Sequence, residues 1–103
     1  MTEVERNLVS LAMALADEAE VLAAKYHWKS PECDDLSLFA YYRRELGEML
    51  KAGQPIPPNR VTPESYFESE DFRNREQRHP EFAARNRDFC RALRSFVEST
   101  PGL

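Results

Sequence analysis

Apolar residues in the first 28 positions recur at helical spacing, which predicts one long amphipathic helix. Successive members of one stripe lie three, four or seven positions apart, and they are Val4, Leu8, Leu11, Leu15, Leu22 and Tyr26. A second apolar strip beside it consists of Val9, Met13, Ala16 and Ala23. Thr2 and Glu5 form a capping box, so we expect the helix to run from about Glu3 to Trp28. An apolar arc this wide predicts packing against more than one neighbour, either other helices of the chain or a second copy.

A second long helix is predicted after Ser30-Pro31, where an N-cap serine precedes a proline at the first helical position. It should begin at about Pro31 or Leu36, run to Lys51 and stop near Gly53. Its broad apolar stripe contains Leu36, Phe39, Tyr42, Leu46, Met49 and Leu50.

The third long helix is predicted at the end of the chain, from about Pro80 to Ser99. Its apolar stripe consists of Phe82, Phe89, Leu93, Phe96 and Val97. Thr100-Pro101-Gly102 provides a stop signal, so we expect residues from about 100 to 103 to be frayed.

The segment between the second and third long helices is broken by proline. Residues 52–63 contain four prolines and predict an extended connector. Thr62-Pro63 is another N-cap followed by proline and starts a short helical segment. Phe67 and Phe72 would point in nearly opposite directions on one continuous helix, so we expect a break near Ser69.

Together these elements predict an all-α fold. We expect one domain spanning residues 1–103, built as a small bundle of three long helices plus one short helical segment, with the proline-rich connector between the second and third. The length suits a single core, and 42% hydrophobic with 31% charged residues is typical of a folded protein. Only three glycines and few β-branched residues argue against a sheet.

Charge and cysteine content indicate a cytoplasmic setting. No stretch is long and apolar enough to cross a membrane, and the acidic start does not resemble a secretory signal. The two cysteines are too few for a disulfide framework. The net charge of −4 arises in residues 1–51, because residues 52–103 carry equal numbers of acids and bases. This balance does not favour non-specific nucleic-acid binding.

No catalytic, cofactor or metal motif stands out, so we expect a protein that is not an enzyme. The four soft ligands His27, Cys33, His79 and Cys90 have none of the usual zinc spacings, and whether they converge on a metal ion is left open. Cys33 near a helix start is a candidate nucleophile. Three neighbouring acids, at positions 32, 34 and 35, disfavour the negatively charged thiolate that a nucleophilic cysteine requires.

An arginine-rich face on the last helix is the clearest candidate for binding. Arg87, Arg91 and Arg94 lie at i, i+4 and i+7, opposite the phenylalanine stripe. Guanidinium groups bind carboxylates and phosphates through two hydrogen bonds at once, so this face is a predicted dock for an acidic partner. A solvated helix face is the alternative interpretation. Three more arginines precede this face, namely Arg73, Arg75 and Arg78.

A second candidate surface is apolar. Leu38 and Tyr41 are predicted on the outer face of the second helix and, with Val9 and Met13 of the first, would form a patch. The alternative is that the short helical segment covers them. Trp28 is ambiguous in the same way, because it would either close the end of the bundle or anchor a partner.

These features favour a small non-catalytic protein–protein interaction module, acting as an accessory, adaptor or inhibitory subunit of a larger assembly. The partner would be a protein, held by the arginine face and by the Leu38/Tyr41 ridge. The alternatives are a nucleic-acid-binding regulator acting through Arg73 to Arg94, which the acidic chain makes less favourable, and an acidic mimic of nucleic acid. A homodimer is also compatible with the wide apolar arc of the first helix.

Overall fold

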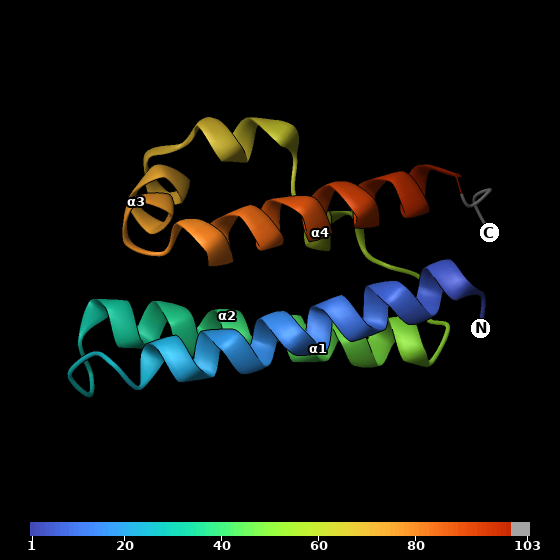
Figure 1. Ribbon diagram of the computed structural model, residues 1–103. Helices are drawn as coiled ribbons and strands as arrows, with labels where there is room; N and C mark the ends of the chain where they lie inside the picture. Colours follow the sequence, from blue (N-terminus) through green and yellow to red (C-terminus); the bar gives the residue numbers. More distant parts are fainter. Residues whose placement is uncertain (100–103) are drawn as a thin grey trace. The chain divides into compact units, whose positions relative to one another are not determined.

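The computed structural model describes residues 1–99, and every regular element in that part of the chain is helical (Figure 1). In chain order the elements are α1 (Glu3–Ala23), α2 (Pro31–Lys51), η1 (Pro58–Arg60), η2 (Glu64–Glu68), α3 (Glu70–Arg78) and α4 (Pro80–Ser99), where η1 and η2 are 3₁₀ turns. The predicted all-α class is therefore confirmed.

The predicted layout of three long helices plus one short segment is matched in part. Helices α1, α2 and α4 have 20 or 21 residues, the short segment is divided at Ser69 into η2 and the nine-residue α3, and η1 is a turn that the layout lacked. The chain divides into two compact units, Met1–Pro55 and a second that begins at Ile56. Assembly of all the helices into a single bundle and a single domain stays a prediction.

Helix α1 starts where the sequence predicted and ends earlier. The Thr2 hydroxyl accepts a hydrogen bond from the Glu5 N–H (3.1 Å), and the Glu5 carboxylate accepts one from the Thr2 N–H (3.0 Å), so the capping box is confirmed. The expected end at Trp28 is wrong, because the helix ends at Ala23. The following residues form tight turns, and Lys29 takes a positive φ of 67°, which reverses the chain toward α2.

Helix α2 has the predicted boundaries. The Ser30 hydroxyl accepts a hydrogen bond from the Cys33 N–H at 3.2 Å, and Pro31 occupies the first helical position. The helix ends at Lys51, and Gly53 has a φ of 70°, a conformation that glycine adopts more readily than residues with a side chain.

Helices α1 and α2 pack along each other as an antiparallel hairpin with a seam of small residues (Figure 1). The buried residues of α1 are Leu8, Ala12, Leu15, Ala16, Ala19 and Ala23, and those of α2 are Leu36, Ala40, Leu46, Gly47 and Leu50. A Cβ added at Gly47 would lie 2.7 Å from Met13 Cε, which shows how closely the helices approach. Val4 and Leu11, expected in the main apolar stripe, are 56% and 44% exposed, because the alanines occupy the contact face instead.

An ion pair connects the polar edges of the same hairpin. The Arg44 guanidinium donates from Nη2 to Asp17 Oδ1 at 2.6 Å and from Nη1 to Glu20 Oε1. These groups are exposed, so the pair contributes modestly to stability while fixing the register of α2 against α1.

The second unit begins after the connector. The prolines of residues 52–63 do prevent a long helix, but part of the connector winds into η1 instead of staying extended. The predicted break at Ser69 is confirmed, because η2 ends at Glu68 and the Ser69 hydroxyl accepts a hydrogen bond from the Phe72 N–H at 3.2 Å. Phe67 is half-buried and Phe72 is buried, with ring centroids 5.1 Å apart.

Helix α4 has the predicted bounds and packs against α3. Its buried residues are Phe82, Ala83, Asn86, Phe89, Cys90 and Leu93, while Phe96 and Val97 are half-buried. The predicted stop and the frayed end, residues 100–103, lie outside the described residues.

Substitutions at Gly47 test the close approach of α1 and α2. Gly47→Val should lower the free energy of unfolding by about 1–3 kcal/mol, because a branched side chain cannot fit beside Met13 and Ala12. Gly47→Ala should change it by less than about 1 kcal/mol, since the flexible end of Met13 can move and alanine favours the helix. Urea denaturation of both variants measures the difference. Equal, small effects of the two substitutions would contradict the close packing.

Candidate functional site

Three large apolar side chains stand together on the outer face of α2. Leu38, Tyr41 and Tyr42 are 54%, 61% and 45% exposed, and we call them the α2 ridge. They lie three and four residues apart, on the side of the helix opposite the buried Leu36 and Ala40. The two tyrosine rings meet edge to face with centroids 5.4 Å apart.

The α2 ridge differs from the predicted patch in two respects. Tyr42 was expected in the core stripe, but it lies at the edge of that stripe, beyond the arc that the small residues of the seam bury. Val9 and Met13 are half-buried, and Met13 packs against the Gly47 position, so neither extends the exposed surface.

The predicted arginine face on α4 binds carboxylates of its own unit. The Arg91 Nε donates to Glu64 Oε1 and Oε2 at 3.0 and 3.2 Å, and the Arg91 Nη2 also donates to Oε1. The Arg94 Nη2 donates to Glu64 Oε2. Arg87 lies 3.5 Å from Glu76 on α3, and its Nε is buried without a hydrogen bond within the described residues. All three predicted arginines therefore hold η2 or α3 against α4.

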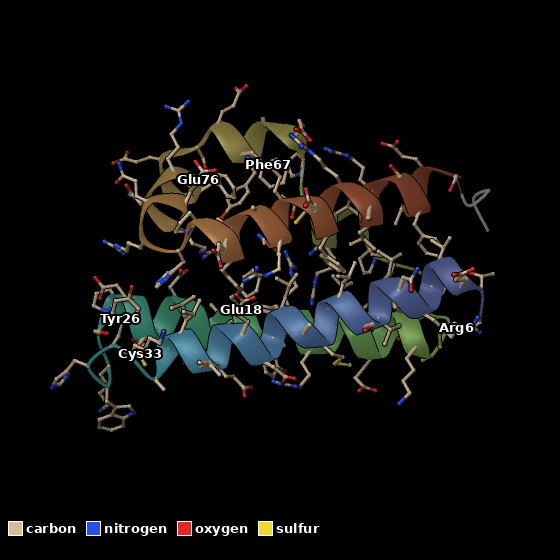
Figure 2. All side chains as sticks on the ribbon, in the orientation of Figure 1. Arg6, Glu18, Tyr26, Cys33, Phe67 and Glu76 are labelled. Atoms are coloured by element: carbon tan, nitrogen blue, oxygen red, sulfur yellow. The ribbon has the colours of Figure 1, made fainter. Side chains whose placement is uncertain are left out.

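The geometry around Glu64 explains its acidity. Hydrogen bonds first from Arg91 and then from Arg94 stabilise the charged carboxylate and lower its pKa to about 2. The Arg91 guanidinium also lies 5.6 Å from the centroid of the Phe67 ring, a cation–π contact. Phe67 lies on the side of η2 that faces α4, and Glu76 projects from α3 (Figure 2).

The remaining predicted arginines lie on α3. Arg73 and Arg78 are exposed, whereas Arg75 is half-buried. They share a helix with Phe72, whose burial holds α3 in the second unit.

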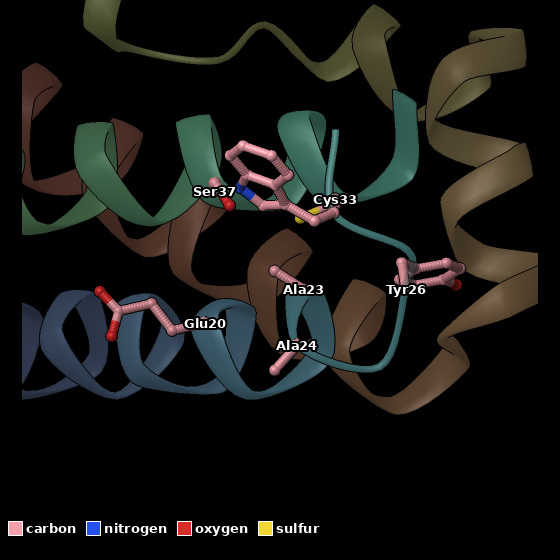
Figure 3. Close-up of a pocket in the computed structure, with 7 residues that line it drawn as sticks. Glu20, Ala23, Ala24, Tyr26, Cys33 and Ser37 are labelled. Carbon is pink, nitrogen blue, oxygen red and sulfur yellow. The ribbon is translucent and has the colours of Figure 1, made fainter. Parts of the chain in front are cut away.

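A shallow cavity of about 340 Å³ lies at the turn between α1 and α2 (Figure 3). Glu20, Ala23 and Ala24 line it from the end of α1, and Cys33 and Ser37 from α2, while Tyr26 and Trp28 come from the turn. Trp28 is 74% exposed, with the Lys29 ammonium 4.5 Å from its ring centroid.

Within residues 1–99, no three His, Cys, Asp or Glu side chains are arranged so that they could hold a metal ion. Cys33, half-buried, and Cys90, buried, are both free thiols. None of the described helices combines the length and the apolar character needed to span a membrane.

Sequence reasoning missed Glu64 as the partner of the arginine face and Tyr42 as part of the ridge. Glu64 lies 30 residues before Arg94 and meets it only after the chain has turned at Ser69 and again near His79. Tyr42 lies at the border of the predicted apolar stripe. Whether a residue at that border is buried or exposed depends on how much of the helix surface the neighbouring helix covers.

Comparisons of the chain with protein-family models, with curated proteins and with solved structures find no match.

The ion pairs of Glu64 predict a specific dependence of stability on pH. Its pKa in the folded state, about 2, lies below the ordinary value of 4.5, so its contribution to stability is complete above pH 4.5. That contribution should be lost as the pH falls from 4.5 to 2. Denaturation at several pH values should therefore show wild type and Glu64→Gln differing most above pH 4.5 and converging near pH 2.

Glu68→Gln provides the matched control, because Glu68 is exposed and forms no ion pair within the described residues. A difference between wild type and Glu64→Gln that stayed constant from pH 7 to pH 2 would contradict the arrangement around Glu64.

Proposed function

We propose that this chain is a small non-catalytic protein–protein interaction module, an accessory, adaptor or inhibitory subunit of a larger assembly, and that the α2 ridge binds its partner. The observation that carries the proposal is the exposure of Leu38, Tyr41 and Tyr42 within one turn of α2. Large apolar side chains scattered singly on a surface are ordinary, but three neighbouring ones favour an interface.

The side chains of the α2 ridge suit the centre of an interface. Tyrosine is enriched at such centres, because its rigid ring buries a large area and its hydroxyl still finds a hydrogen-bond partner. Burial of apolar surface contributes roughly 25 cal/mol per Å², so covering the ridge would stabilise a complex by a few kcal/mol. Binding to a partner is the simplest way in which that free energy would be released.

The arginine face supports the proposal less directly. A partner carboxylate that approached Arg91 or Arg94 would compete with Glu64, which both already bind. We therefore assign the main contact to the α2 ridge, and Arg87, Arg91 and Arg94 to holding η2 and α3. The same engagement weakens the alternative of nucleic-acid binding through Arg73 to Arg94, as does the net charge of −4.

We further propose that the protein acts in the cytoplasm. The two free thiols suit a reducing compartment, where disulfides are rare. The proposal that it is not an enzyme rests on the lack of any catalytic motif in the sequence.

A photo-crosslinking amino acid placed at position 38 tests the proposed surface in cells that naturally contain the protein. We expect a discrete adduct with one larger protein at position 38 and none at position 21. Val21 is the matched control, because it is 61% exposed and apolar but lies on α1. No adduct at position 38, or equal adducts at both positions, would refute the proposal. An adduct with the mass of two copies would indicate a homodimer instead of a larger assembly.

A further inference from the structure

The polar residues around the α2 ridge are acidic, and this charge points to the kind of partner. Asp34 lies one turn before Leu38, and Glu45 lies one turn after Tyr41. Glu48 follows Glu45 by a further turn on the same outer face. The outer face of α2 is thus apolar in the middle and carries carboxylates toward both ends.

Two of the three basic residues of α2 make contacts away from this face. Arg44 is directed toward α1, where it binds Asp17 and Glu20. Arg43 lies over the ring of Phe39, 4.6 Å from the guanidinium carbon to the ring centroid. Lys51 is the last residue of the helix.

Two of the carboxylates are available to a partner. Asp34 and Glu48 are exposed, and neither side chain forms an ion pair within the described residues. They are 14 positions apart on one helix, which corresponds to about 21 Å along its axis at 1.5 Å per residue. The ridge lies between them, and a helix of about four to five turns would span the whole face.

We propose that the α2 ridge binds a basic amphipathic helix of another protein, whose apolar face covers Leu38, Tyr41 and Tyr42 while lysines or arginines at its ends meet Asp34 and Glu48. This inference rests on the proposed function and adds the chemistry of the partner. Recognition of one helix by another uses apolar anchors at i, i+3, i+4 and i+7, and the ridge presents the first three of these positions. Opposite charge at the rim accelerates association and fixes the direction of the bound helix.

A second copy of the chain is a poorer occupant of the same surface. An antiparallel pair of α2 helices would bring Asp34 of one copy beside Glu48 of the other, and a parallel pair would bring like residues together. Either arrangement places like charges across the rim of an apolar contact, which opposes association. The charge of the face therefore selects a basic partner over self-association.

The test uses the full chain and a fluorescently labelled synthetic peptide of about 18 leucine and lysine residues patterned as an amphipathic helix. Fluorescence anisotropy should detect saturable binding that weakens with added salt. A peptide in which glutamate replaces every lysine should not bind. Leu38→Ser combined with Tyr41→Ser should weaken binding more than about tenfold, and Val21→Ser should leave it unchanged.

A charge control separates recognition from general attraction to an acidic protein. Asp34→Asn with Glu48→Gln should weaken binding roughly five- to tenfold at low salt, whereas Glu68→Gln with Glu98→Gln changes the net charge equally and should have little effect. Circular dichroism of each variant verifies that the helices are retained.

Two binding results would overturn the inference: no binding of the basic peptide, or an equal loss of affinity in both pairs of charge variants. It would also be overturned if light scattering gave the mass of a dimer and the combined Leu38→Ser and Tyr41→Ser substitutions converted that dimer to a monomer. If the peptide failed to bind while crosslinking at position 38 still captured a larger protein, only the basic character of the partner would be wrong. If crosslinking also failed, the proposed function itself would fall.

Discussion

The close approach of α1 and α2 determines which side chains the first unit presents to solvent. Ala12 and Met13 of α1 lie against Gly47 of α2, so the two helices leave little space for a larger side chain at that position. Once small residues occupy that seam, the phase of α2 is fixed, because a helix rotated by one position would drive a larger side chain against α1. Leu38 and Tyr41 must then point outward. The seam therefore fixes the direction in which the α2 ridge points.

The second unit is organised by different physical forces. An aromatic cluster of Tyr66, Phe67 and Phe72, with edge-to-face rings 5.1–5.8 Å apart, joins η2 to α3. Glu64 at the start of η2 binds two arginines of α4 that lie three residues apart, so one carboxylate holds a short 3₁₀ turn that has little burial of its own. Ring contacts and ion pairs therefore both hold η2 within the second unit.

The features that sequence could predict are those encoded within a few residues. The capping box of Thr2 and Glu5, the N-caps at Ser30 and Ser69 and the helix bounds of α2 and α4 all follow from local hydrogen bonding and backbone geometry. The early end of α1 was not predictable in this way, because residues 24–28 have no strong stop signal and the return to α2 decides their conformation.

The candidate site was predictable in part for the same reason. Leu38 and Tyr41 lie far from the apolar arc of their helix, so periodicity alone placed them outside. Tyr42 lies at the border of the arc, where the size of the facing residues decides. The pairing of Arg91 and Arg94 with Glu64 joins residues 27 and 30 positions apart, and no single-helix spacing encodes such a contact.

The two free cysteines fall one in each unit, Cys33 half-buried in the first and Cys90 buried in the second. A thiol reagent can reach Cys90 only when the packing around α4 opens, so its labelling rate follows the local opening equilibrium of that unit. Cys33 is half-buried and lines the shallow cavity at the turn, so a reagent reaches it without such opening. The chain thus carries an intrinsic probe of opening in its second unit, and Cys33 provides an internal reference for the same reagent.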